Sequence, residues 1–125
     1  MYFVGPKPQP VLAAIYSAAS VGVFPSFEEP MGMVFLECMA CGTPVIGADS
    51  GGPKDFVSPA EGALVPETPS LGEDTERFCS DLADKIVTSL QEDWKSTKGP
   101  KGLALVTRKY STLKQVRDML KTWGW

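Results

Sequence analysis

Histidine is absent from this sequence of 125 residues, and its absence removes several kinds of chemistry at once. Catalysis by a Ser–His or Cys–His pair needs an imidazole as general base, so these mechanisms are excluded. A zinc site is not expected either, because such sites draw most of their ligands from cysteine and histidine. We therefore expect neither a metal nor another cofactor.

Cysteine is scarce, and long apolar runs are missing. The three cysteines, Cys38, Cys41 and Cys79, are an odd number that does not suggest a disulfide framework, so we expect a reducing compartment, the cytoplasm. Cys38 and Cys41 form a CxxC pair, but they lie at the end of a predicted helix without a second pair, and we interpret them as core residues. No apolar run approaches the ~20 residues of a transmembrane helix.

What is present is the composition of an ordinary globular domain, with 43% hydrophobic residues and an uneven charge. Nine acidic and two basic residues lie between positions 61 and 93, whereas eight basic residues and one acidic residue follow from 94 onward. No nucleic-acid motif accompanies the basic part, so we expect no nucleic-acid partner. We expect this part to dock on another domain; contact with an anionic membrane, helped by Trp123 and Trp125, is the less favoured alternative.

Short apolar runs alternate with helical periodicity, which predicts an α/β fold with a Rossmann-like parallel sheet and flanking helices. Strands are expected at 1–5, 21–24, 45–48 and 62–65. Helices are expected at 10–19, 33–41, 75–90, 103–110 and 112–123, with one helical turn at 54–57. The helix at 75–90 should bury a stripe made of Phe78, Leu82, Ile86 and Leu90. Residues 66–74 should form an exposed loop, and 95–102 should interrupt the helical pattern.

The stretch 25–45, PSFEEPMGMVFLECMACGTPV, contains the most informative feature, a helix start between two carboxylates. The first N–H groups of a helix lack partners and carry the positive end of its dipole, and Gly32 should leave space for an anion there. Glu29 precedes these amides and Glu37 lies a little over one turn inside the helix. Ligands of parallel sheets bind beyond the carboxyl ends of the strands, so residues 26–32 and 49–52 should line one crevice.

This stretch, with IYSAASVGVFPS before it and ADSGGPKDFV after it, resembles the signature of the retaining GT-B glycosyltransferases of family four. The resemblance covers roughly residues 1–90 and implies a donor-binding domain that transfers a sugar from a nucleoside diphosphate-sugar with retention. It implies that Glu29 faces the donor sugar, as the catalytic residue, and that Glu37 binds the ribose hydroxyls. The amides around Met31, Gly32, Met33 and Val34 would bind the diphosphate.

Simpler interpretations stay open for these residues. Glu29 could be a solvated loop acid, or could accept backbone N–H groups at the helix start, and Glu37 could lie on an exposed helix face. Other functions are a phosphorylase or sugar-nucleotide epimerase, which fit the carboxylate pair less well. A non-catalytic subunit or fragment that binds a sugar nucleotide or docks to a partner chain is a further alternative.

Two parts of a GT-B enzyme have no counterpart here. The N-terminal acceptor domain is missing, and so is the beginning of the donor domain, where the family carries an arginine and a lysine that clamp the diphosphate. We divide the chain into a nucleotide-sugar-binding portion at 1–93 and basic C-terminal helices at 94–125, which pack on it or on the missing domain. The chain alone is expected to be inactive.

Overall fold

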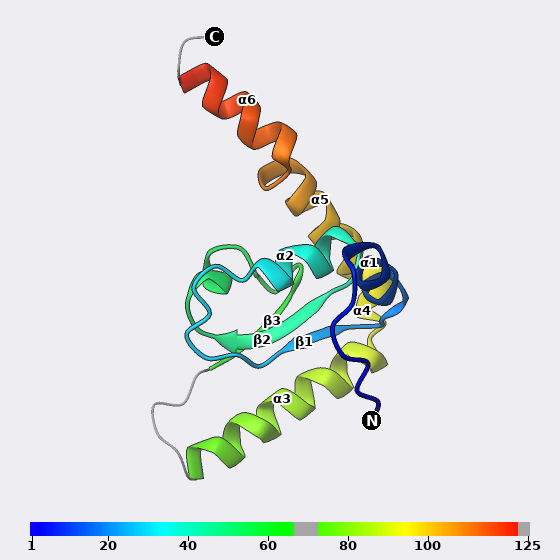
Figure 1. Ribbon diagram of the computed structural model, residues 1–125. Helices are drawn as coiled ribbons and strands as arrows, with labels where there is room; N and C mark the ends of the chain where they lie inside the picture. The colour runs from blue at the N-terminus through cyan, green and yellow to red at the C-terminus, as the bar shows by residue number, and fades with distance from the viewer. Residues whose placement is uncertain (67–72, 123–125) are drawn as a thin grey trace.

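The computed structural model describes residues 1–66 and 73–122, which form a parallel sheet with helices on both faces (Figure 1). The sheet has three strands in the order β1-β2-β3: β1 (Gly22–Phe24), β2 (Val45–Asp49) and β3 (Gly62–Pro66). Val23 lies opposite Ile46, which lies opposite Ala63. The predicted α/β fold with a Rossmann-like parallel sheet is confirmed for these strands.

Two hydrophobic clusters cover the two faces of β2, whose side chains alternate between them. On one face Val45 packs with Phe35, Met39 and Leu105, and on the other Ile46 packs with the cluster members Ala48, Val65, Phe78 and Trp94. The first cluster joins β2 to α1 (Gln9–Ala18), α2 (Met33–Ala40) and α5 (Gly99–Lys109), and the second joins it to α3 (Glu73–Gln91) and α4 (Trp94–Thr97). Burial on both faces explains why β2 is a nearly continuous apolar run.

Helix α2 begins and ends close to the predicted positions. Gly42 follows it with a φ of +70°, and its N–H donates to the Met39 carbonyl at 2.9 Å, so the chain leaves the helix through the left-handed region. Pro44 then prevents continuation, and β2 begins at Val45. The predicted turn at 54–57 is present as the 3-10 helix η1 (Gly52–Asp55).

Residues 1–5 do not form the predicted strand. Met1, Tyr2 and Phe3 are each more than nine-tenths exposed, and the neighbour of β1 in the sheet is β2 alone. A strand requires a paired neighbour for its backbone groups. The apolar pattern of this segment suggested a strand, but none of the described strands pairs with it.

The predicted interruption at 95–102 is also wrong, because α4 and α5 leave only Lys98 between them. Pro100 lies in the first turn of α5, where a missing N–H costs no hydrogen bond. A Cβ on Gly99 would lie 2.3 Å from the Gly42 carbonyl oxygen, so this glycine permits close packing of α5 against the end of α2. In α3, Leu90 is 57% exposed and does not belong to the buried stripe.

Helix α6 (Thr112–Thr122) continues from α5 and projects from the body of the molecule (Figure 1). Within it no residue is buried. No helix in the described ranges combines the length and apolar composition needed to cross a bilayer. The loop expected at 66–74 lies mostly outside the described residues, as do Trp123 and Trp125.

Candidate functional site

The loops that follow β1 and β2 meet directly at the carboxyl edge of the sheet, as the sequence predicted. The Glu28 N–H donates to the Ser50 hydroxyl at 2.7 Å, and the Gly52 N–H donates to the Glu29 carbonyl at 2.8 Å. Gly51 has a φ of +60°, and a Cβ on it would lie 2.0 Å from the Glu29 carbonyl oxygen. Any residue other than glycine at position 51 would therefore force the two loops apart.

The start of α2 presents unpaired backbone donors at this edge. The N–H groups of Phe35 and Leu36 both donate to the Gly32 carbonyl, which begins the helix. The N–H groups of Met31, Met33 and Val34 have no acceptor among the described residues. Three donors therefore remain for an anion, aided by the positive end of the helix dipole.

Gly32 is required by its backbone conformation and by the packing around it. It is buried with a φ of +70°, and a Cβ on it would lie 2.9 Å from Pro53 and 3.0 Å from the Phe56 ring. The missing side chain therefore makes room for η1 and its neighbour, and the space for an anion that the sequence predicted stays a prediction. The backbone conformation and this packing fix glycine at position 32.

The Glu29 carboxylate lies at the helix start. Its Oε1 accepts the Gly32 N–H at 3.0 Å, and the residue is half-buried. This hydrogen bond is one of the alternatives that the sequence left open, and it places a negative charge beside the three unpaired amides. The predicted contact of Glu29 with a donor sugar stays a prediction.

Glu37 lies on α2, half-buried, near Tyr16 of α1. Burial raises the pKa of the Tyr16 phenol, and the negative charge of Glu37 raises it further. The resemblance implies that ribose hydroxyls of the donor hydrogen-bond to this carboxylate. Among the described residues it has no hydrogen bond or ion pair, so its oxygens are available to a ligand.

A cavity of about 340 Å³ adjoins the helix start and contains two of the predicted residues, Met31 and Met33. Its lining also includes Phe56 and Tyr110, whose ring centroids lie 5.7 Å apart. Sequence reasoning missed this part of the lining because Tyr110 follows α5, which is far from α2 along the chain. The amphipathic pattern of α5 was the one available signal, and it does not reveal which partner it packs on.

Of the CxxC pair that the sequence assigned to the core, Cys38 is buried and Cys41 is partly exposed, and Cys79 is exposed. Cys38 is fully buried, and burial, followed by the neighbouring Cys41, raises the pKa of its thiol to about 12. A thiol that stays protonated at neutral pH is neither a nucleophile nor a ready metal ligand. Within residues 1–66 and 73–122 no cluster of three acidic or cysteine side chains could hold a metal ion.

A parallel sheet whose carboxyl edge carries a helix start with free amides is the arrangement of a Rossmann-like domain, and in such domains ligands lie at this edge. Residues 1–96 match the family model of the glycosyl transferases group 1, and the chain belongs to this family. The resemblance seen in the sequence is thereby confirmed, and with it the GT-B type of fold.

Among curated relatives, the chain is 51% identical over 65 residues to a D-inositol 3-phosphate glycosyltransferase of Kribbella flavida; this covers 51% of the chain and 15% of the relative. It is 38% identical over 94 residues to the protein of that name from Frankia alni, covering 75% of the chain and 21% of the relative. Among solved structures, a sucrose-phosphate synthase from Thermosynechococcus elongatus superposes with a TM-score of 0.83 at 36% identity, covering 98% of the chain and 29% of that structure. The chain thus spans roughly a fifth of the length of these curated relatives.

Proposed function

We propose that this chain supplies the donor-binding part of a retaining glycosyltransferase, which transfers a sugar from a nucleoside diphosphate-sugar to an acceptor. The observation that carries the proposal is the start of α2, where three unpaired amides lie between Glu29 and the unpaired carboxylate of Glu37. This segment lies inside the region matched by the family.

The diphosphate is assigned to the amides of Met31, Met33 and Val34. Oriented backbone N–H groups at a helix start bind phosphate without any metal ion. Gly32 contributes the backbone turn, and its own N–H becomes available when Glu29 moves away. The proposal requires no further cofactor, because the amides, together with cations from elsewhere in the full donor domain, balance the diphosphate charge.

Glu37 is assigned to the ribose. It lies five residues beyond Gly32, which corresponds to about 7.5 Å along a helix, a distance that a nucleoside diphosphate spans. A carboxylate accepts hydrogen bonds from vicinal hydroxyls, and these charge-assisted bonds are stronger than neutral ones.

Glu29 is assigned to the transferring sugar. Its carboxylate is tethered to the helix start, beside the position where the sugar would emerge from the diphosphate. There it can accept hydrogen bonds from sugar hydroxyls and oppose the positive charge that develops as the glycosidic bond to phosphate breaks.

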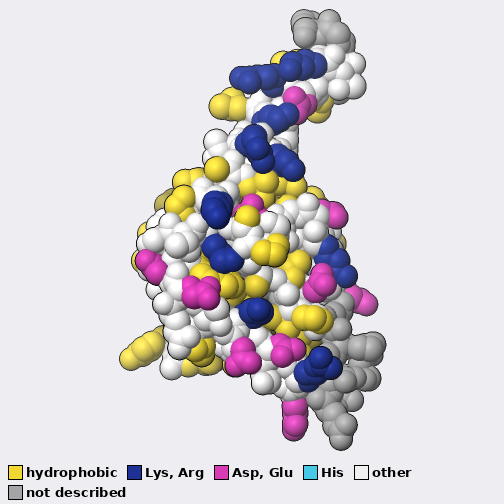
Figure 2. Space-filling model, turned by 180° about the vertical axis from the view of Figure 1, so that it is seen from behind, with side chains coloured by type: hydrophobic (Ala, Val, Ile, Leu, Met, Phe, Trp, Pro, Cys, Tyr) yellow, Lys and Arg dark blue, Asp and Glu magenta, His cyan; other side chains and the backbone are white. Residues whose placement is uncertain are grey.

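The remaining partner is an acceptor-binding domain or chain, and α6 is the surface that we assign to it. Leu113 and Met119 are 80% and 48% exposed, and Val116 and Leu120 extend the same apolar face. Cations lie along this projecting helix (Figure 2), so a partner with an apolar groove rimmed by acidic residues would suit it. We propose the cytoplasm as the compartment, which suits three free cysteines.

Titration of the 125-residue chain with nucleoside diphosphates and their sugar conjugates tests this proposal. We expect weak, saturable binding that shifts the amide NMR signals of residues 31–36. Binding that leaves these signals unchanged, or no binding to any nucleoside diphosphate, would refute the assignment.

A further inference from the structure

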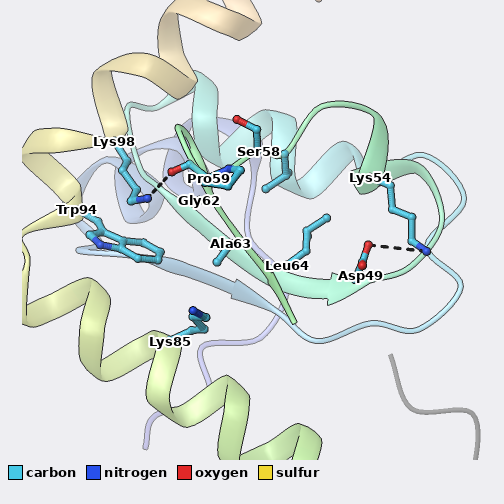
Figure 3. A pocket seen from close by; sticks show the side chains of 11 residues that line it. Asp49, Lys54, Ser58, Pro59, Gly62, Ala63, Leu64, Lys85, Trp94 and Lys98 are labelled. Atoms are coloured by element: carbon cyan, nitrogen blue, oxygen red, sulfur yellow. Dashed lines mark hydrogen bonds and ion pairs between the residues drawn. The ribbon is translucent and has the colours of Figure 1, made fainter. Parts of the chain in front are cut away.

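A second cavity, of about 410 Å³, lies along the edge of β3 that pairs with no described strand, away from Glu29 and Glu37 (Figure 3). Gly62, Ala63 and Leu64 of the strand form its floor. The loop before β3 forms one side, and Trp94 of α4 and Lys85 of α3 form the other. Its volume lies in the range of pockets that hold small molecules.

The cavity lining carries an excess of positive charge. Lys54 of η1, Lys85 of α3 and Lys98 between α4 and α5 reach it from separate parts of the fold. Asp49 is the carboxylate in the described lining, and it already pairs with Lys54 at 3.7 Å. The positive charges of Lys85 and Lys98 therefore have no counter-charge within the cavity.

Lys98 is held in place. Its ammonium donates to the Pro59 carbonyl and lies 4.1 Å from the centroid of the Trp94 ring. Burial lowers the pKa of Lys98; Glu92 and Glu61 oppose this, whereas the ammonium groups of Lys101 and Lys85 lower it further. A fixed cation that is repelled by a neighbouring cation is a favourable place for an anion.

Lys85 supplies the adjustable charge. It is exposed on α3 and has no acceptor or carboxylate partner among the described residues, and Figure 3 shows its side chain rising toward the edge of β3. A flexible ammonium beside a fixed one can close on an anion that enters between them.

We propose that this cavity binds a small phosphate monoester, with the phosphate between Lys85 and Lys98. A phosphate monoester carries close to two negative charges at neutral pH and so matches two lysines that form no ion pair within the cavity lining, whereas a carboxylate carries one. The uncharged part of the molecule lies along the β3 edge, beside Gly62, Ala63 and Leu64. The site shares no residue with the proposed donor site.

The test is an NMR titration of the isotope-labelled 125-residue chain with glucose 6-phosphate, inorganic phosphate and, as an uncharged control, glucose. Glucose 6-phosphate should shift the amides of residues 62–64 and the Trp94 indole N–H saturably, and glucose should not. Lys85→Gln should raise the Kd about tenfold, since a hydrogen bond to a charged group is lost, and Lys85→Arg should retain most of the affinity.

Arg77→Gln is the matched control, because it removes one positive charge from the same helix at a side chain that does not line the cavity. It should leave the Kd unchanged. The proposal is overturned if Lys85→Gln and Arg77→Gln behave alike, if glucose binds as well as its phosphate, or if the shifts fall on residues 31–36 instead of 62–64. Absence of saturable binding up to about 10 mM would also overturn it.

Discussion

The carboxylate of Glu29 accepts the backbone N–H of Gly32 at 3.0 Å, and it thereby occupies one of the amides at the start of α2. A phosphate that approaches this helix start meets a carboxylate of the same sign. For a donor to bind as proposed, Glu29 must leave this hydrogen bond and turn toward the sugar. The same residue then changes from a helix-start acceptor into a sugar ligand.

Glu29→Gln should therefore separate catalysis from nucleotide binding. In a complete enzyme that contains this chain, we expect kcat to fall roughly 10²–10³-fold, because the negative charge that stabilises the positive charge of the transition state is removed. The affinity for the bare nucleoside diphosphate should stay equal or increase, because the repulsion at the amides disappears. Steady-state kinetics and calorimetry measure the two effects.

Glu28→Gln is the control for this change. Glu28 is the exposed neighbour, and its contribution to the site is through its backbone N–H to Ser50, which the substitution keeps. It should leave both kcat and affinity nearly unchanged. Equal losses of kcat and nucleotide affinity in Glu29→Gln would make Glu29 a structural loop acid.

Glu37→Gln should weaken binding of both the donor and the free nucleoside diphosphate. The loss of charge-assisted hydrogen bonds to ribose is expected to cost roughly 1.5–3 kcal/mol. Calorimetry on the variant measures this cost, with Glu76→Gln on the exposed side of α3 as the control. An unchanged affinity in a well-folded Glu37→Gln variant contradicts the ribose assignment.

Substitution at Gly32 should destabilise the fold. Gly32 and Gly42 share a φ of +70°, but a Cβ meets Pro53 and Phe56 at position 32 and nothing within 4 Å at position 42. Gly42→Ala should therefore lower the free energy of unfolding by about 1 kcal/mol through backbone strain alone. Gly32→Ala should lower it by about 1–3 kcal/mol more, because the added methyl is overpacked. Urea unfolding measures both losses. Equal losses in the two variants would show that η1 moves away from the added methyl group without lowering the free energy of unfolding.

Cys38 should make stability depend on alkaline pH. Its thiol pKa is raised from 9.0 to about 12 in the fold, so the native state keeps a proton that the unfolded chain loses. The contribution of Cys38 is fully present below pH 9.0 and decreases as the pH rises toward about 12. Urea unfolding from pH 8 to 11 should show a smaller decline in Cys38→Ala, in which this thiol is missing; parallel declines would contradict the prediction.

The sequence predicted most of the sheet and α2 because their signals are local. Gly42 and Pro44 end the helix through backbone chemistry alone, and the apolar run from Val45 marks a strand that is buried on both faces. The errors share a cause in tertiary context. Gly99 and Pro100 have the local chemistry of a break, yet packing against Gly42 makes them part of a helix. Residues 1–5 have the pattern of a strand but no neighbour among the described strands.

In the candidate site, too, the sequence predicted the features that depend on local structure and missed those that depend on tertiary contacts. Free amides at the start of α2 follow from helix geometry, so the sequence could predict them. The packing of Pro53 and Phe56 against Gly32, and the charge of three lysines at the β3 edge, depend on which distant segments meet. No spacing along the chain encodes these contacts.

The last prediction concerns the 125-residue chain by itself, which should show no glycosyl transfer and should self-associate through α6. The helix exposes Leu113, Val116 and Met119 along one face, and its main contact among the described elements is with α5. Apolar surface of α6 therefore stays in water. The exposed residues 1–4 add to this tendency, although they do so as an unpaired segment and not as the sheet edge that the sequence suggested. Replacing Leu113 and Met119 by Ser should shift sedimentation toward the monomer, whereas Val87→Ser, an equally exposed position on α3, should not. Turnover by a monomeric wild-type chain would show that this segment carries a complete active site, and association unchanged by the α6 substitutions would place the contact elsewhere.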